Sequence, residues 1–433
     1  MRLKEIHLTN FRCFEQLDVQ LNDRLAVFLG VNGAGKTAVL EAINRLYAKD
    51  YVARFFNYTD TDSRQIQIES RKNMRIGAKK ASMSMKVELS STDKFDWRLE
   101  FEFPTSTSFG YHPKNDDIHN WVSKYIKKSE ESPLMNLPLF AFYKSEKAVD
   151  INDENYLEPE AIKLKQLWAF KNVFRNEKDS FNNFLTWFDD KANYENSIRL
   201  EKDYAYRDLK FQIVRQSIAT FLDTLTDSSF KNLRVNKKDP DYVFDSSKNV
   251  LTITKDNLDI DVNQLSAGEK SVILLIADLS KRLAIANPSL GNPLEGEGIV
   301  LIDEIDLHLH PQWQRNILPA LLTTFPKCQF IVTTHSPLVI SNVGRESVFI
   351  LENGKLVKNT PHTLGRDYAS ILYNVFGVEE RPAEYQEKID ACFRLIENEQ
   401  YEEAKSALKK LSEELGEDDI DIIRANVILE MEA

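Results

Sequence analysis

Hydrophobic and polar positions alternate along the start of the chain in the manner of β-strands. Alternation runs through residues 1–21, and a continuous apolar run, LAVFL, occupies residues 25–29. Alternation is typical of half-buried strands, whereas a short continuous run is typical of a strand buried on both faces. From Thr37 to Tyr47 the apolar side chains recur at helical spacing. We therefore expect strands, then a buried strand, then a helix.

The middle of the chain changes character several times. Residues 82–103 alternate again and predict a β-hairpin, and residues 137–143 predict a buried strand. Between them, residues 105–135 are polar, aromatic and irregular, so we expect an insertion or a mobile loop there. Residues 155–230 predict a helical subdomain without heptads long enough for a long coiled coil. Residues 243–254 predict another hairpin-like stretch.

The last third of the chain alternates between helices and strands. Over residues 264–352 this order is typical of parallel strands joined by helices, the α/β arrangement. The expected strands are residues 299–302, 330–332 and 348–351. From Ala383 to Glu432 the pattern predicts two or three amphipathic helices with a break at Gly416.

Composition narrows the class of protein. The 433 residues are 42% apolar and 28% charged, which is ordinary for a globular protein with a sizeable core. No apolar run approaches the ~20 residues of a membrane-spanning helix, and the first residues lack the apolar stretch of a signal peptide. We expect no membrane partner and a cytoplasmic location. The cysteines Cys13, Cys328 and Cys392 are far apart and predict neither a disulfide framework nor a zinc site.

Charge is unevenly distributed. The net charge is -11, but residues 379–433 alone contain 17 acidic and 7 basic side chains, so the rest is almost neutral. A basic face on that remainder is compatible with DNA as a partner, although solvated loops are the more usual meaning of basic runs. The basic candidates are Arg71, Lys72, Arg75, Lys79 and Lys80, with Lys231, Arg234, Lys237 and Lys238 as a second group.

The strongest chemical signal follows the apolar run at residues 25–29. Residues 30–37 read GVNGAGKT, which matches the G-x-x-x-x-G-K-T phosphate-binding loop in its required place between a strand and a helix. Backbone amides and a helix N-terminus would surround the β-phosphate of ATP, with Lys36 reaching the β- and γ-phosphates. A chance glycine turn is disfavoured by this context. The candidate nucleotide-binding residues are Gly30, Asn32, Gly33, Ala34, Gly35, Lys36 and Thr37.

A second motif supplies paired carboxylates. Residues 299–304 read IVLIDE, an apolar strand that ends in Asp303 and Glu304. Asp303 is expected to hold Mg²⁺ together with the Thr37 hydroxyl, and Glu304 to act as the general base toward the attacking water. The alternative is a strand that merely ends in solvated acids, which the phosphate loop upstream disfavours.

Residues 265–270 read LSAGEK and precede an apolar helix. They resemble the LSGGQ signature of ABC ATPases. Ser266 and the Gly268 backbone would form an anion site at a helix N-terminus, which makes sense if it covers a nucleotide held by a second subunit. An ordinary capping box between Ser266 and Glu269 is the alternative, and both can hold together.

Three further positions match this resemblance. His335, in TTHSP, corresponds to the histidine that contacts the γ-phosphate, and Asp306 to the loop that crosses the dimer interface. Arg12, in NFRCF, resembles an arginine that lies near the nucleotide in SMC-like and RecF-like ATPases; a turn arginine at the surface is the alternative.

Gln65 and Gln67 are candidates for the glutamine loop, and Tyr143 to Lys147 ends a strand without an assigned role. His308 and His310 lack further metal ligands nearby, so interface or hinge histidines are preferred there.

The order of these motifs resembles the soluble ABC ATPases that include RecF, SMC and the old-lysogenisation nucleases. Further stretches resemble the ATPase subunit (PtuA) of Septu anti-phage systems, also found with some retrons. They are Asn10 to Arg12, Trp187-Phe188 with Glu195-Asn196, Gln264 to Lys270, Glu304 to Pro311, Gly365 to Asp367 and Gly377 to Pro382. This resemblance implies an ATP- and Mg²⁺-dependent ATPase, a homodimer or higher homo-oligomer, and an HNH-type nuclease partner.

The resemblance also implies an α/β ABC ATPase head: a mixed sheet with a phosphate-loop core, an inserted helical subdomain and a C-terminal helical tail. The expected parts are an N-terminal ATPase lobe (1–154), a helical subdomain (155–240), a C-terminal ATPase lobe (241–378) and an acidic tail (379–433).

Other activities are less compatible with the chain. Old-lysogenisation nucleases carry a metal-dependent Toprim domain after the head, but only 98 residues follow His335, and the DID at residues 419–421 follows a helical stretch. We therefore expect no built-in nuclease. A RecF-like protein that binds DNA directly, and an ATP-gated scaffold with negligible turnover, remain the alternative hypotheses.

Overall fold

The chain folds into two compact units in the computed structural model, Met1–Arg366 and Asp367–Ala433. The second unit begins earlier than the expected tail at residue 379, because α10 (Tyr368–Phe376), capped by Asp367, belongs to it. The finer division into four parts remains a prediction. The structure describes residues 1–47, 51, 73–89, 94–102, 116–132, 134–144, 165–170, 177–225, 230–236, 250–378 and 381–431.

A six-stranded sheet forms the centre of the first unit, in the order β13-β12-β3-β11-β10-β6. All its strands are parallel except β13, which pairs antiparallel with β12. Every residue of β3, β10 and β11 is buried, as is typical of parallel strands covered on both faces. The expected mixed α/β sheet is confirmed. Its strands are β3 (Leu25–Leu29), β6 (Leu139–Tyr143), β10 (Gly298–Ile302), β11 (Cys328–Thr333), β12 (Val348–Glu352) and β13 (Lys355–Leu356).

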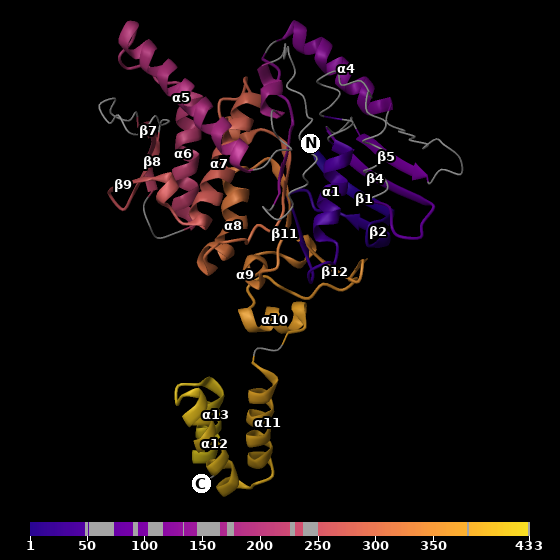
Figure 1. Cartoon of the computed structure of the whole chain (residues 1–433), viewed down its shortest axis with the longest axis vertical. Helices are drawn as coiled ribbons and strands as arrows, with labels where there is room; N and C mark the ends of the chain where they lie inside the picture. The colour runs from indigo at the N-terminus through magenta and orange to yellow at the C-terminus, as the bar shows by residue number, and fades with distance from the viewer. Residues whose placement is uncertain are drawn as a thin grey trace. The chain divides into compact units, whose positions relative to one another are not determined.

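Helices pack around this sheet. In Figure 1, α1 (Lys36–Tyr47) and α7 (Ala267–Ala286) lie on either side of β11. Helix α7 also packs against α5, α6 and the short helix η3, so part of the expected helical subdomain covers it. The other helices of this group are η3 (Lys165–Phe170), α5 (Glu177–Glu201), α6 (Leu209–Leu225), α8 (Pro311–Thr324) and α9 (Pro337–Ile340), with short turns η4 (Val262–Gln264), η5 (Pro293–Glu295) and η6 (Arg345–Ser347).

Two antiparallel sheets complete the unit. One has the order β2-β1-β4-β5 and contains the expected hairpin; the other has the order β7-β8-β9. Strand β8 overlaps the predicted hairpin-like stretch at residues 250–254, whereas residues 243–249 of that stretch are outside the described residues. The strands are β1 (Arg2–Phe11), β2 (Phe14–Gln20), β4 (Lys80–Glu88), β5 (Lys94–Glu102), β7 (Phe230–Asn236), β8 (Val250–Lys255) and β9 (Leu258–Asp261).

The expectation of irregular structure over residues 105–135 is wrong for part of the stretch, because Asp116–Glu131 forms helix α4. Val122 and Tyr125 are buried, and Trp121 stacks on Tyr51 with ring centroids 6.2 Å apart. The aromatic side chains thus lie on one face of a helix. Their helical spacing was hidden because charged and polar residues make up most of the helix around them.

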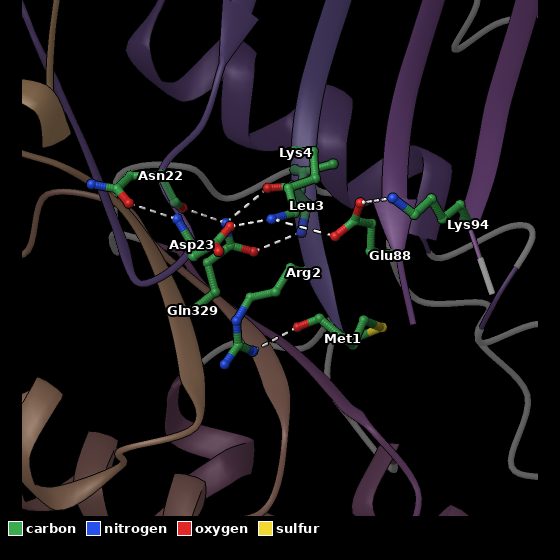
Figure 2. Close-up of polar contacts among 9 residues, drawn as sticks. All are labelled: Met1, Arg2, Leu3, Lys4, Asn22, Asp23, Glu88, Lys94 and Gln329. Carbon is green, nitrogen blue, oxygen red and sulfur yellow. Dashed lines mark hydrogen bonds and ion pairs between the residues drawn. The ribbon is translucent and has the colours of Figure 1, made fainter. Parts of the chain in front are cut away.

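Gln329 joins the central sheet to the antiparallel sheet (Figure 2). Its side chain is fully buried in β11. Its Oε1 accepts a hydrogen bond from Leu3 N at 2.7 Å, and its Nε2 donates to the carbonyls of Leu3 and Asn22, each at 2.8 Å. One amide side chain therefore satisfies backbone groups of β1 and of the loop after β2.

The second unit is helical, as expected. Its helices after α10 are α11 (Ala383–Glu397), α12 (Tyr401–Leu415) and α13 (Ile420–Met431), and the predicted break falls at Gly416, where α12 ends. Apolar faces of these three helices share one small core. Arg381 pairs with Asp419 at 2.8 Å and with Asp421 at 2.9 Å. Both aspartates of the DID stretch therefore form ion pairs within this unit. Among the described helices of the chain, none is long and apolar enough to cross a membrane.

Candidate functional site

Three parallel strands bring most candidate residues to one edge of the central sheet. The phosphate loop follows β3, the Asp303-Glu304 pair follows β10, and His335 lies two residues beyond the end of β11. Strands β3 and β10 both pair with β11, so the three segments leave the sheet from neighbouring strands. Ligands bind at the carboxyl ends of strands in such sheets.

Lys36 starts α1 and its side chain is buried. Its Nζ donates to the carbonyls of Gly30 at 2.9 Å and Val31 at 3.2 Å, so the ammonium is held by its own loop. Burial lowers the pKa of Lys36 below its ordinary value, and the nearby Asp303 carboxylate partly opposes this effect. A buried cation whose hydrogen-bond partners among the described residues are backbone carbonyls fits an anionic ligand such as a phosphate.

The turn between β1 and β2 packs directly against the phosphate loop. Gly35 has φ of +107°, and a Cβ there would come within 2.6 Å of Cys13 Sγ. Arg12 lies in the same turn, where its Nε donates to Asn73 Oδ1 at 2.8 Å and its guanidinium pairs with Glu41 of α1. Arg12 is therefore a half-buried residue of this turn, and its neighbour Cys13 lies against the phosphate loop. A nucleotide contact by Arg12 remains a prediction.

Asp303 and Thr37 meet as the sequence predicts. The Thr37 hydroxyl donates to the Asp303 carboxylate, with distances of 3.1 and 3.0 Å to its two oxygens. Burial raises the pKa of Asp303, while hydrogen bonds from Thr333 and Thr37 oppose this rise. A bound cation would favour the ionised form of this carboxylate. The Thr37 hydroxyl and the Asp303 carboxylate together fit Mg²⁺, which prefers hydroxyl, carboxylate and phosphate oxygens as ligands.

Glu304 follows in an unusual backbone conformation. Its φ is +50°, in the left-handed region that non-glycine residues rarely adopt. Its N–H donates to Thr333 Oγ1 at 2.7 Å, and the next amide, of Ile305, donates to the Thr333 carbonyl at 3.0 Å. Sequence reasoning did not single out Thr333. Its place at the carboxyl end of a buried strand was the available signal.

Asp306 and His335 are also brought together. Asp306 Oδ1 accepts hydrogen bonds from the His335 backbone N–H at 3.3 Å and from the Thr334 hydroxyl. Burial and the Lys36 charge lower the pKa of His335, while the Asp306 carboxylate opposes them. A neutral imidazole is therefore favoured near neutral pH.

The LSAGEK segment forms the N-terminus of α7. Ser266 and Glu269 make the expected capping box, in which the Ser266 side chain accepts from Glu269 N and Glu269 binds the Ser266 amide. Gly268 packs against the backbone after Asp306, where a Cβ would overlap the carbonyl oxygen of His308. Ser266 itself is exposed, so this helix terminus is open to a partner.

A buried polar cluster ties α7 to the same edge of the sheet. The Tyr143 hydroxyl donates to Asp278 Oδ2 at 3.1 Å, and Asp278 pairs with Arg282. The Tyr143 carbonyl accepts from Asp303 N at 2.9 Å. Tyr143, which had no assigned role, therefore links α7 to β10, whereas residues 145–147 are outside the described residues.

The remaining candidates lie elsewhere. His310 caps α8 by accepting from Gln312 N, and within the described ranges no group of three or more His, Cys, Asp or Glu residues could hold a metal ion. Arg75 pairs with Glu15 at 2.9 Å, and Arg234 pairs with Asp259. Lys79, Lys80 and Lys231 are exposed. Gln65, Gln67, Arg71, Lys72, Lys237 and Lys238 lie outside the described residues.

Known proteins resemble this chain over most of its length. The family model described as "AAA domain, putative AbiEii toxin, Type IV TA system" matches residues 25–341. The "Retron Ec83 probable ATPase" of Escherichia coli is 31% identical over 99% of this chain and 87% of its own. The "Retron Vc95 probable ATPase" of Vibrio cholerae is 27% identical over 92% and 83%. "Septu protein PtuA" of Bacillus thuringiensis is 24% identical over 94% and 93%.

The matched family model spans the phosphate loop, the α7 terminus, the carboxylate pair and His335, which are the segments that the fold assembles. The chain therefore belongs to this AAA-domain family, and it is an ATPase of the ABC type that resembles PtuA and the retron ATPases.

Proposed function

We propose that the protein hydrolyses Mg²⁺-bound ATP in a homodimer that encloses two nucleotides, and that this cycle controls an associated nuclease in anti-phage defence. The observation that carries the proposal is the meeting of Thr37 with Asp303, beside Lys36 and Glu304, at one sheet edge. This is the donor set that phosphoryl transfer requires.

Each residue has a distinct task in this proposal. Lys36 and the loop amides bind the β- and γ-phosphates, while Thr37 and Asp303 would hold Mg²⁺, which neutralises charge on the phosphates. Glu304 orients the attacking water and accepts its proton. His335, favoured as the neutral form, contacts the γ-phosphate through its ring. The general-base step accounts for about 10²–10⁴-fold of the rate.

The dimer explains the exposed terminus of α7. The exposed Ser266 hydroxyl, the Gly268 backbone in the first turn and the helix dipole of α7 suit a γ-phosphate. Helix α7 lies across the sheet from α1, which carries Lys36 (Figure 1). We propose that this terminus covers the nucleotide of the second subunit, with Asp306 at the interface.

The dimer is tested with Glu304→Gln. This variant should bind ATP but not activate water, so ATP and Mg²⁺ should convert it to a dimer of doubled mass by light scattering, with turnover reduced by about 100-fold or more. Lys36→Ala is the matched control, because it should lose nucleotide affinity and stay unchanged in mass. A Glu304→Gln mass that does not respond to ATP would contradict ATP-driven dimerisation.

The defence role draws support from relatives named for retrons and for Septu. We propose an HNH-type nuclease as the partner and the cytoplasm as the location. A tagged protein purified from cells with its native operon should carry a stoichiometric nuclease, whose cleavage of DNA changes with Glu304→Gln. A protein that purifies alone and binds DNA with strong salt dependence would instead favour a RecF-like role.

A further inference from the structure

Thr333 ends the buried strand β11 and touches both residues of the carboxylate pair. Its side chain is fully buried. Its hydroxyl donates to Asp303 Oδ1 at 2.6 Å and accepts from Glu304 N at 2.7 Å. A single hydroxyl thus lies between the proposed Mg²⁺ ligand and the proposed general base.

The direction of these hydrogen bonds follows from the groups involved. An amide N–H can only donate, and a hydroxyl has one proton to give and lone pairs to accept. The Thr333 proton must therefore point to the Asp303 carboxylate, which leaves a lone pair for the Glu304 amide. The Asp303 carboxylate accepts from the hydroxyl, and the hydroxyl in turn accepts from the Glu304 amide, so the three groups form a continuous chain of hydrogen bonds.

The Glu304 backbone needs such support. Its φ of +50° is unfavourable for a residue with a side chain, and a conformation of this kind persists where its surroundings enforce it. Thr333 contacts the segment twice, because its carbonyl also accepts from Ile305 N at 3.0 Å. Both amides that flank the Glu304 Cα are thereby bonded to one residue.

We propose that Thr333 is a positioning residue that fixes the direction of the Glu304 side chain through the backbone. The inference rests on the proposed ATP hydrolysis and adds a residue that acts on the general base without touching the nucleotide. Misplacement of a catalytic group by about 1 Å can cost about 100-fold in rate, so loss of the hydroxyl should act on turnover.

The test compares two substitutions at this position. Thr333→Val keeps the branched shape but removes the hydroxyl, so kcat should fall at least ~10-fold while the Kd for ATP stays within ~3-fold. Thr333→Ser retains the hydroxyl and should restore most of kcat. A kcat of Thr333→Val near that of the unmodified protein, or no rescue by serine, would overturn the inference.

Thr363→Val is the matched control for loss of a buried hydroxyl. Thr363 is fully buried, and its hydroxyl donates to the Val343 carbonyl at 2.6 Å, away from the carboxylate pair. This variant should lower thermal stability without the fall in kcat. An equal fall in kcat for both valine variants would identify a general folding defect and contradict a positioning role for Thr333.

A double variant separates this inference from the proposed function. If Thr333 acts through Glu304, Thr333→Val should cause little further loss in a Glu304→Gln background, measured in single-turnover reactions. A full additional loss would contradict action through Glu304. By contrast, a Glu304→Gln protein with normal turnover would overturn the proposed function itself.

Discussion

At the scale of single residues, the close approach of two backbones limits which side chain can stand at the N-terminus of α7. Gly268 is held against the His308 carbonyl, and His308 has φ of +62°. The segment after Asp306 and the start of α7 thus leave no room for a side chain between them. A movement of either segment would be passed to the other, because packed backbones do not compress.

We therefore expect Gly268→Ala to be costly. The added methyl must displace His308 or α7, so we predict a loss of about 1–3 kcal/mol in the free energy of unfolding, as for other overpacked sites. ATPase activity should fall while the Kd for ATP, set by Lys36 and its loop, changes little. Denaturant unfolding and nucleotide titration check both parts.

Gly291→Ala provides the control, because a Cβ there would meet nothing within 4 Å. It should leave stability and activity close to those of the unmodified protein. Equal effects of the two alanine substitutions would show that the Gly268 contact is unimportant.

At the scale of elements, buried polar groups connect the two sheets and fix their relative alignment, which hydrophobic packing alone would not specify. Gln329 joins β11 to β1 through its hydrogen bonds to Leu3. Figure 2 also shows the next residue of β1, Lys4, which forms ion pairs with Asp23 and Glu88. The polar contacts fix which backbone groups of the two sheets face each other. The buried amide is the essential member, since exposed ion pairs contribute little.

Gln329→Met should destabilise the first unit. Methionine has a similar length but removes the hydrogen bonds that Gln329 makes to the buried N–H and carbonyl of Leu3 and to the partly buried Asn22 carbonyl. A buried group left unsatisfied costs about 1–3 kcal/mol before relaxation. We predict a total loss of at least ~2 kcal/mol in the free energy of unfolding, measured with denaturant. Gln16→Met, which removes an exposed hydrogen bond to Asp18, should cost less than ~0.5 kcal/mol. Similar losses for both would contradict a special role for Gln329.

At the scale of the whole molecule, the candidate nucleotide-binding residues are all in one of the two units. Every candidate nucleotide-binding residue described above lies in Met1–Arg366, whereas the second unit has its own helical core. The acidic residues from 379 onward account for most of the net charge of -11. We therefore expect ATP binding not to require the acidic helices.

Removal of residues 367–433 should leave ATP binding intact, with a Kd within ~3-fold of the full chain, because no residue of the proposed site is lost. Fluorescent nucleotide titration of the shortened chain tests this, and retained cooperative thermal unfolding shows that the first unit still folds. A folded but nucleotide-free shortened chain would show that the second unit contributes to the site.

Some features of the site and the fold could be predicted from the sequence, and others could not. The phosphate loop, the carboxylate pair and the capping box were readable because each is a local pattern of residue types next to an apolar strand or helix. Helix α4 was missed, since charged residues masked the spacing of Trp121, Val122 and Tyr125. Thr333 and Tyr143 were not assigned roles, because the partners described for them are 28 or more residues away along the chain.

The sequence by itself determined that this chain would build a buried parallel sheet with a phosphate loop at one strand end, because hydrophobic period and motif spacing are local properties. Only the tertiary structure decided which distant groups meet. Thr37 reaches Asp303 across 266 positions, and Gln329 reaches Leu3 across 326, because strand order brings them together. Strand order depends on packing of the whole unit, which no single stretch of residues encodes.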